Sequence, residues 1–374
     1  MRKSKFKVGI AGCGSIFLMH AQSLVNTPDI ELAAVCDIRA PRAKRAARRY
    51  NCRYYLDYRK MLENENLNAV HILTPHYLHS SMAIQALNKK INVLTEKPIS
   101  INPRDGERMI KAAKRNNVKL GVISQNRYNP GSQLVKKNLL TGKLGKVKAA
   151  KLILSYHKPD SYYKRSDWRG RLKLEGGGVL IDQAIHFIDV LRWLINDKVE
   201  YVEANTARRM HKFIEVEDLA EGIIKFKKGA YICFHLINFY SYDADPEIEM
   251  DCQNGRVKMI KDSARIGFYD GRVVEAKPDP SEYIDYGQGR KDYWGFCHWI
   301  QIKEFYRALK EGRQPEVNGE EGLKTQEIVW NIYKSARLGR RILFRDGSRP
   351  KAEVSPKRGH FTNDVRTVPT IEKG

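Results

Sequence analysis

The sequence contains no long apolar run. Nothing in its 374 residues approaches the roughly 18 consecutive apolar residues of a membrane-spanning helix. Its first residues, Met1 to Lys5, are mainly basic and lead into a strand-like segment, which is not the pattern of a secretory signal peptide. We therefore expect no contact with a membrane.

Cysteine is sparse and no Cys-x-x-Cys pair occurs. The six cysteines are scattered: Cys13, Cys36, Cys52, Cys233, Cys252 and Cys297. Because disulfide frameworks and structural zinc sites need regular cysteine spacing, we expect a reduced, cytoplasmic protein without a metal ion. His71, His76 and His79 lie close together, but His71 falls within a predicted strand and no cysteine or carboxylate completes a ligand set.

Acidic residues are too few to balance the basic ones, and the formal net charge is +24. The excess is spread along the chain, apart from a cluster between residues 41 and 50. There, arginines and a lysine alternate with Ala43, Ala46 and Ala47, as on the exposed face of a surface helix. Since no nucleic-acid-binding motif accompanies them, we expect no specific nucleic-acid partner.

The first 40 residues have the pattern of a dinucleotide-binding unit. An apolar strand, Lys7 to Ala11, leads into the turn Gly12-Cys13-Gly14-Ser15-Ile16-Phe17 and a helix to Val25, and a second strand ends at Asp37. Gly12 would permit the tight turn, Gly14 would let backbone N–H groups approach a pyrophosphate, and Asp37 would bind the adenosine ribose. This predicts NAD. Arg39 leaves NADP possible, and Phe17 stands where Gly or Ala is usual.

Two further strands, Ala69–Leu73 and Ile91–Leu94, continue this doubly wound pattern. Ligands in such sheets lie beyond the carboxyl ends of the strands. Lys97, held by Pro98, follows the second of these ends and would stabilise an alkoxide or share a proton next to a nicotinamide; the alternative is a surface lysine. We expect the cofactor to contact Gly12, Gly14, Ser15, Ile16, Asp37, Arg39, Thr74, Pro75, His76, His79, Glu96 and Lys97.

The second half of the chain is rich in β-strand patterns. Asn254-Gly255 and Asp270-Gly271 are tight-turn signals between such runs, and they predict an antiparallel sheet of about six strands. Two helices are expected near 294–309 and 320–338. We expect a Rossmann domain at 1–124, an α+β domain at 125–344 that binds substrate and associates with other copies, and a flexible basic tail at 345–374.

A glycine-rich segment in the second domain carries candidate catalytic groups. After Gly176, Gly177 and Gly178, the residues Asp182, His186 and Asp189 recur at i, i+4 and i+7, which places them on one helical face. A carboxylate and an imidazole so placed can move a proton. Alternatively, this is a buried helix whose histidine is merely hydrogen-bonded. For Asp189 we favour a structural role.

Taken together, these motifs resemble the Gfo/Idh/MocA family, which includes glucose–fructose oxidoreductase and inositol dehydrogenase. The motifs are the glycine turn with His20, Thr74-Pro75 with His79, Glu96-Lys97-Pro98, and Asp182-x-x-x-His186. The resemblance covers about residues 5 to 343. It implies a Rossmann domain, a C-terminal domain on a large, open, mostly antiparallel sheet, tightly held NAD(P), and hydride exchange at a hydroxyl-bearing carbon of a sugar or cyclitol. It also implies that Lys97, Asp182 and His186 are catalytic.

Asp167-Trp168-Arg169-Gly170 resembles members that act on sugars, nucleotide-linked sugars or their uronates. Trp168 and Arg169 offer a stacking plane and an anion-binding fork. The expected substrate contacts are Arg127, Trp168, Arg169, Asp182, His186, His298 and Gln301. The alternatives are interdomain ion pairs for the arginines and a core position for the tryptophan.

The expected reaction is an oxidation in which His186 takes the substrate hydroxyl proton, Lys97 stabilises the alkoxide, and Asp182 orients the imidazole or binds a hydroxyl. Whether Lys97 or His186 is the immediate base stays open. Two other functions compete: a redox-neutral NAD-dependent glycosidase and a non-catalytic NAD(P) sensor. We expect a homodimer or homotetramer formed through the open sheet.

Overall fold

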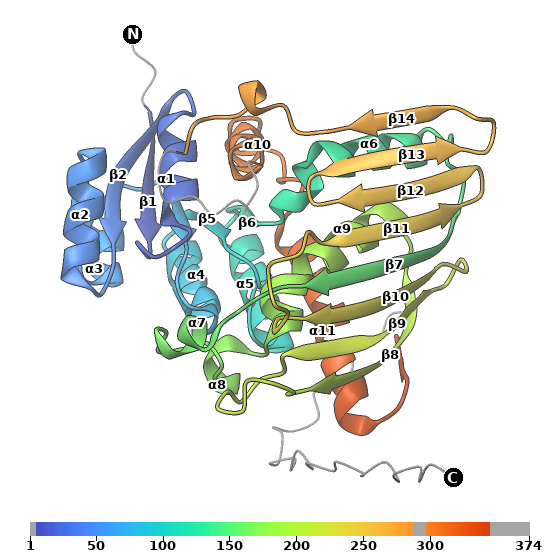
Figure 1. Ribbon diagram of the computed structural model, residues 1–374. Helices are drawn as coiled ribbons and strands as arrows, with labels where there is room; N and C mark the ends of the chain where they lie inside the picture. Colours follow the sequence, from blue (N-terminus) through green and yellow to red (C-terminus); the bar gives the residue numbers. More distant parts are fainter. Residues whose placement is uncertain (1–4, 287–296, 345–374) are drawn as a thin grey trace.

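The computed structural model describes residues 5–286 and 297–344 of the chain. Within them, a parallel sheet and a larger mixed sheet lie next to each other (Figure 1). Trp294, near which a helix was predicted to begin, and the predicted flexible tail at 345–374 lie outside the described residues.

The first sheet has six parallel strands in the order β3-β2-β1-β4-β5-β6. Its strands are β1 (Phe6–Ala11), β2 (Ile30–Cys36), β3 (Arg53–Tyr55), β4 (Ala69–Ile72), β5 (Asn92–Thr95) and β6 (Leu120–Val122). Its helices are α1 (Phe17–Val25), α2 (Ala40–Tyr50), α3 (Tyr58–Asn64), α4 (His79–Asn88) and α5 (Pro103–Arg115). The prediction of a doubly wound N-terminal unit is confirmed.

Helix α2 shows how the sequence specifies this unit. Its alanines, Ala43, Ala46 and Ala47, are buried and belong to one helical stripe, while its lysine and most of its arginines face outward. The basic cluster is therefore the exposed face of a surface helix, as predicted.

The second sheet has nine strands in the order β14-β13-β12-β11-β7-β10-β9-β8-β15. Its strands are β7 (Val147–Ser155), β8 (Val199–Ala207), β9 (Leu219–Phe226), β10 (Tyr231–Ile237), β11 (Glu247–Cys252), β12 (Gly255–Ile260), β13 (Ser263–Phe268), β14 (Val273–Ala276) and β15 (Ile342–Leu343). The expected count of six was too low, and the sheet is not wholly antiparallel because β10 pairs with β7 in parallel. Both predicted tight turns are present.

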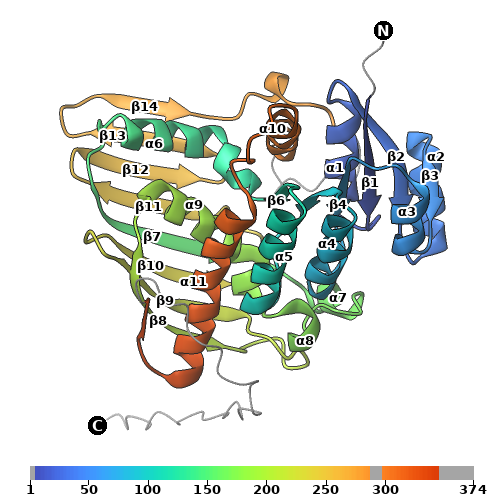
Figure 2. The same ribbon diagram turned by 180° about the vertical axis from the view of Figure 1, so that it is seen from behind.

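Helices cover one face of the large sheet and leave the other bare (Figures 1 and 2). The covering helices are α6 (Pro130–Leu140), α9 (Ile185–Ile195) and α11 (Gly319–Leu338). Their apolar residues form one core with the inner side chains of the strands. Helix α10 (His298–Lys310) instead packs on α1, where Phe305 and Tyr306 join the core of the first sheet. The second half of the chain thus completes the first unit.

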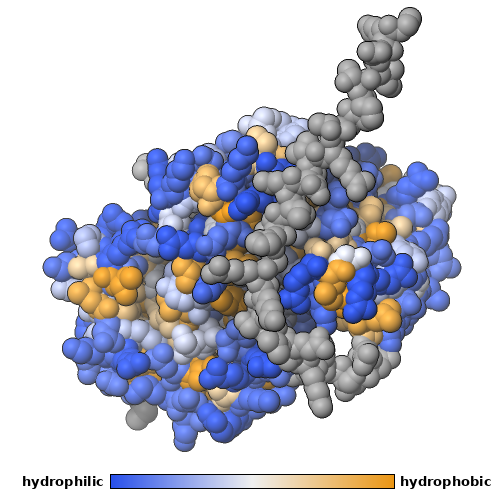
Figure 3. Space-filling view, turned by 90° about the horizontal axis from the view of Figure 1, so that it is seen from below, coloured by the Kyte–Doolittle hydropathy of each residue, from blue (hydrophilic) through white to orange (hydrophobic). Residues whose placement is uncertain are grey.

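On the face seen in Figure 3, hydrophilic residues predominate and hydrophobic ones form small separate groups. None of the helices in the described part of the chain is long and apolar enough to cross a membrane.

Candidate active site

A cavity of about 1210 Å³ lies at the carboxyl ends of the strands of the first sheet, and the second unit forms its other wall. From the first unit it is lined by the glycine turn, Asp37, Thr74 to His79, Glu96 and Lys97. From the second unit come Tyr156 to Pro159, Ser161, Tyr162, Arg165 to Arg169, Asp182, His186 and His298. Residues predicted from separate motifs therefore meet in one place.

The glycine turn forms one end of the cavity. Gly12 has a φ of +100°, and a Cβ there would lie 2.6 Å from the carbonyl oxygen of Leu73, so only glycine fits. The Asp37 carboxylate accepts hydrogen bonds from the backbone N–H groups of Cys13 (2.9 Å) and Arg39 (2.8 Å). Phe17, at the unusual motif position, begins α1 and packs edge-on against Tyr50. The turn keeps its dinucleotide-binding form because Phe17 points into the core.

Two histidines tie the cavity wall together. His76 Nδ1 donates to the carbonyl of Glu175 (2.9 Å), and its ring lies 4.6 Å from that of Trp168. His79 bridges the ends of two strands, since its ring nitrogens each lie 2.8 Å from a carbonyl oxygen, of Thr74 and of Pro98. Both line the cavity, but their polar atoms serve the protein framework.

Lys97 and Asp182 form an ion pair at the centre of the cavity. Lys97 Nζ donates to the backbone carbonyl of Asp182 (2.6 Å) and to its carboxylate (3.1 Å). The other carboxylate oxygen accepts hydrogen bonds from Tyr162 (2.6 Å) and Gln183 (2.5 Å). Burial would raise the pKa of Asp182, but the charges of Lys97 and Arg169 hold it below its usual range. The lysine is thus fixed in place by a carboxylate.

His186 lies beside this pair and faces the cavity. Within the described residues its ring makes no hydrogen bond, so the expectation that Asp182 orients it is wrong: both oxygens of Asp182 bind other partners. Burial, and next the charge of Lys97, lower the pKa of His186 to about 3. The imidazole is therefore neutral near pH 7.

The positions of Asp182 and His186 follow from the local backbone. Residues Leu180–Ala184 form a π-helical turn that precedes α9, where a regular helix was expected. Such turns are frequent at functional sites. Glu217 holds the entrance to the turn, since its carboxylate accepts from the N–H groups of Gly178 (2.9 Å) and Leu180 (3.0 Å) and from Tyr333 (2.8 Å). A Cβ on Gly178 would lie 1.8 Å from the carbonyl oxygen of Glu217.

Glu96 belongs to a buried histidine cluster that the sequence pattern did not reveal. Its Oε1 lies 2.9 Å from His20 Nε2 and 3.6 Å from His298 Nε2. His20 Nδ1 is bonded to His71 (2.9 Å), which in turn contacts Tyr306 (2.8 Å). Ligand atoms of His20, Glu96 and His298 lie within 4.8 Å of one another, close enough for a metal ion. Because His20 bonds directly to Glu96, we interpret the cluster as a hydrogen-bonded part of the protein framework and not as a metal site.

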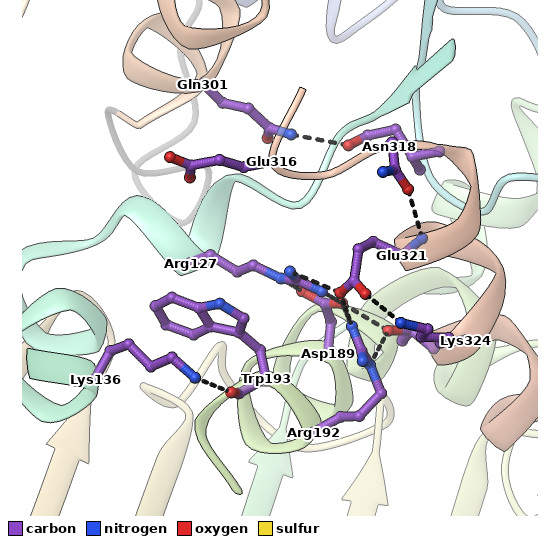
Figure 4. A network of polar contacts seen from close by, with 12 residues as sticks. Arg127, Lys136, Asp189, Arg192, Trp193, Gln301, Glu316, Asn318, Glu321 and Lys324 are labelled. Atoms are coloured by element: carbon purple, nitrogen blue, oxygen red, sulfur yellow. Dashed lines mark hydrogen bonds and ion pairs between the residues drawn. The ribbon is translucent and has the colours of Figure 1, made fainter. Parts of the chain in front are cut away.

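The substrate roles predicted for Arg127 and Gln301 need correction. Arg127 is buried and makes two 2.7 Å hydrogen bonds to Asp189 (Figure 4). Gln301 is buried as well and binds the backbone of Val122 and Ser124. Neither lines the cavity. Arg127 forms an ion pair, which was the alternative that we gave for it, and Asp189 has the structural role that we expected. His298, Trp168 and Arg169 do line the cavity.

Comparisons with known proteins agree with this geometry. A model described as "Oxidoreductase family, NAD-binding Rossmann fold" matches residues 6–124, and one described as "GFO/IDH/MocA C-terminal domain" matches residues 132–258. A myo-inositol 2-dehydrogenase from Thermotoga maritima is 26% identical over 345 residues, covering 90% of this chain and 98% of that protein. A D-apiose dehydrogenase from Paraburkholderia graminis is 24% identical over 362 residues, covering 90% and 89%.

A solved structure is similar over nearly the whole fold. The WlbA dehydrogenase from Bordetella pertussis, in complex with NADH and UDP-GlcNAcA, superimposes with a TM-score of 0.79 at 29% identity. The match covers 91% of this chain and 99% of that one.

Proposed function

Because the chain belongs to the GFO/IDH/MocA family of NAD-binding oxidoreductases, we propose that it exchanges hydride with a hydroxyl-bearing carbon of a sugar, sugar derivative or inositol. The observation that carries this is the position of Lys97, Asp182 and His186 in the same cavity as the dinucleotide turn. The relatives named above are dehydrogenases of inositol and of an aldose.

The residues at one end of the cavity fit NAD. Gly12 lets the turn lie against the backbone of Leu73, Gly14 has open space beside it, and Asp37 offers carboxylate oxygens where the ribose of the adenosine is expected. When bound, the nicotinamide supplies the hydride acceptor or donor. Gly14 and the N-terminus of α1 would hold the pyrophosphate. The protein then has to position the substrate hydroxyl and handle its proton.

Lys97 and His186 are the residues that would handle the proton of the substrate hydroxyl. A substrate hydroxyl between the two side chains would give its proton to the neutral imidazole while the ammonium of Lys97 stabilises the alkoxide oxygen. Asp182 keeps Lys97 in position through two contacts, of 2.6 and 3.1 Å. Its role is to position the lysine rather than to orient the histidine.

This function is tested by absorbance of the reduced nicotinamide with a panel of sugars, uronates, inositols and nucleotide sugars. We expect at least one to form NADH, and His186→Ala to lose that turnover while NADH still binds. NADH binding without turnover of any panel member would favour the non-catalytic sensor instead. Hydrolysis of an aryl glycoside without net NADH would favour the glycosidase.

The low pKa of His186 has a consequence for the pH dependence. Since the ring is neutral above about pH 4, lowering the pH from 8 to 6 does not protonate it. We expect kcat/KM for NAD reduction to show no inflection near an ordinary imidazole pKa of about 6.5. The measurement is a pH profile of kcat/KM for the wild type between pH 5 and 8, in which an inflection near 6.5 would contradict this assignment.

An ion pair at the cavity mouth predicts the cofactor preference. Arg39 donates to Asp167 across the cleft (2.7 Å), and both side chains line the cavity. Asp167→Asn would release Arg39 for a 2′-phosphate and remove a nearby negative charge. Because the pair is exposed, we expect only an about 3- to 10-fold gain in NADPH affinity, with NADH affinity little changed. Fluorescence titration measures both.

The matched control is Asp160→Asn. Asp160 lies in the same segment but pairs with Lys164 and does not line the cavity. An unchanged ratio of NADPH to NADH affinity in Asp167→Asn would rule out this role of the ion pair.

We further propose that copies of the chain associate through the uncovered face of the nine-stranded sheet, and that the protein works in the reducing cytoplasm. The bare face in Figure 1 supports the first point, and the six free cysteines agree with the second. Light scattering of the purified protein measures the oligomeric state.

A further inference from the structure

Arg169 is the one guanidinium that stacks on aromatic rings within the described cavity wall. Its Cζ lies 4.4 Å from the ring centre of Trp168 and 4.7 Å from that of Tyr162. The two rings hold the planar group in place, so little conformational freedom remains to be lost when a ligand binds.

This guanidinium has unused hydrogen-bonding capacity. Its Nε is buried and has no hydrogen-bond partner among the described residues, where no ion pair to Arg169 is formed either. A buried N–H without an acceptor is unfavourable, because it has lost its hydrogen bonds to water. In native proteins such groups are uncommon, and a catalytic role, an ordered water or a bound ion is among the reasons for which they occur.

The acidic residues near Arg169 are already engaged. Asp182 uses its oxygens for Lys97, Tyr162 and Gln183. Glu175 accepts a hydrogen bond from the N–H of Gly170 and is buried. Burial alone would lower the pKa of Arg169, but the charges of Asp182 and Glu175 raise it. Neither carboxylate forms an ion pair with Arg169 among the described residues, so a direct anionic partner of Arg169 would come from a ligand.

We propose that Arg169 forms a subsite for an oxyanion carried by the sugar substrate, so that the preferred substrates are acidic sugars. This rests on the proposed function. A planar fork of N–H donors matches a carboxylate in two parallel hydrogen bonds. The same chemistry would bind a phosphate of a nucleotide-linked sugar, and the two sources are separated below.

The subsite lies at the right place relative to the reacting hydroxyl. Tyr162 joins the two, because its ring stacks on Arg169 while its hydroxyl donates to Asp182 (2.6 Å), which holds Lys97 (3.1 Å). One short chain of contacts thus separates the anion site from the catalytic lysine. In this arrangement the sugar would place its hydroxyl at Lys97 and its acid group at Arg169, which both line the cavity.

The test is calorimetric binding to the NADH-loaded protein with four probes: D-glucuronate, D-glucose, UDP-glucuronate and UDP-glucose. We expect each acidic sugar to bind about 10- to 100-fold more tightly than its neutral counterpart, and Arg169→Gln to remove that preference, since hydrogen bonds to charged groups have this magnitude. If Arg169→Gln instead weakens both UDP-sugars equally, the bound oxyanion is a phosphate.

Three results would overturn the proposal. The first is that the wild type binds acidic or phosphorylated probes no more tightly than neutral ones. The second is that Arg169→Gln binds every probe with an affinity within twofold of the wild type. The third is that Arg169→Gln loses affinity for NADH alone. None of these binding measurements requires turnover. An absence of hydride exchange would therefore contradict the proposed function and not the anion subsite.

Control variants separate charge from fold. Arg169→Lys keeps the charge but not the fork, and it should recover only part of the preference. Arg171→Gln removes an exposed arginine two residues away that does not line the cavity, and it should bind all probes as the wild type does. Equal melting temperatures for the three variants show that the pocket is still folded.

Discussion

Replacing Lys97 with methionine is expected to lower kcat by about 10³-fold or more while the affinity for NADH changes less than threefold. Removing one preorganised donor to a developing oxyanion lowers kcat about 10²- to 10³-fold, and losing a proton-transfer group has a similar effect. Lys97 would donate to the oxyanion and hold the hydroxyl from which His186 takes the proton, so its loss affects both steps. Steady-state rates and fluorescence titration of NADH measure the two quantities.

The same substitution leaves the buried carboxylate of Asp182 without its cation, which destabilises the fold. The double variant Lys97→Met, Asp182→Asn removes that charge and should recover melting temperature but not turnover. Lys89→Met, at an exposed ion pair with Glu63 (3.6 Å), is the matched control and should behave as the wild type. Turnover within tenfold of wild type in the double variant would show that Lys97 is not catalytic.

The N-terminal unit could be predicted because its signals are local. A strand, a glycine turn, a helix and a terminal acid follow one another within about 30 residues, and each step has a steric reason. The 2.6 Å approach of the backbone at Leu73 to the site of a Cβ on Gly12 is one of them. The cavity residues Lys97 and Asp182 could be predicted for a related reason. Lys97 follows the end of a strand, and Asp182 follows a run of three glycines, and both features are recognisable in the sequence.

Orientation around a short turn could not be predicted. Gln125, Asn126 and Arg127 occupy one 3₁₀ turn, η2 (Gln125–Tyr128), yet the first two line the cavity and the third points away from it. The buried carboxylate of Asp189, 62 residues further along, decides this by binding the guanidinium. The π-helical turn likewise arises from contacts with Glu217, which no helical periodicity encodes.

Partners distant in the sequence were also missed. Tyr162 orients Asp182 and stacks on Arg169, and it comes from a segment without a recognised motif. The contact of His298 with Glu96 joins α10 to the end of β5, about 200 residues earlier. His20, which belongs to the motifs of the resemblance, was a usable signal, because a histidine six residues after Gly14 lies within α1 and beyond the turn that would hold the phosphates.

Asp189→Ala is expected to destabilise the protein by about 3–5 kcal/mol, which is a fall in melting temperature of roughly 6–20 °C for a unit of this size. Asp189 makes two 2.7 Å hydrogen bonds to Arg127 and one of 2.6 Å to Thr325 (Figure 4). Both partners of the ion pair are buried, so among the described residues the variant leaves Arg127 with Glu321, at 3.3 Å, as its one acidic partner. A thermal melt measures the change.

The pH dependence of this loss distinguishes an ion pair from simple packing. Burial would raise the pKa of Asp189, but Arg127 lowers it, so the carboxylate stabilises the fold above its unfolded pKa of about 3.9 and less as the pH falls below that. The difference between wild type and Asp189→Ala should therefore be larger at pH 7 than at pH 3.5. Asp160→Ala, at an exposed pair, should cost less than about 1 kcal/mol, and an equally small effect of Asp189→Ala would contradict the assigned role.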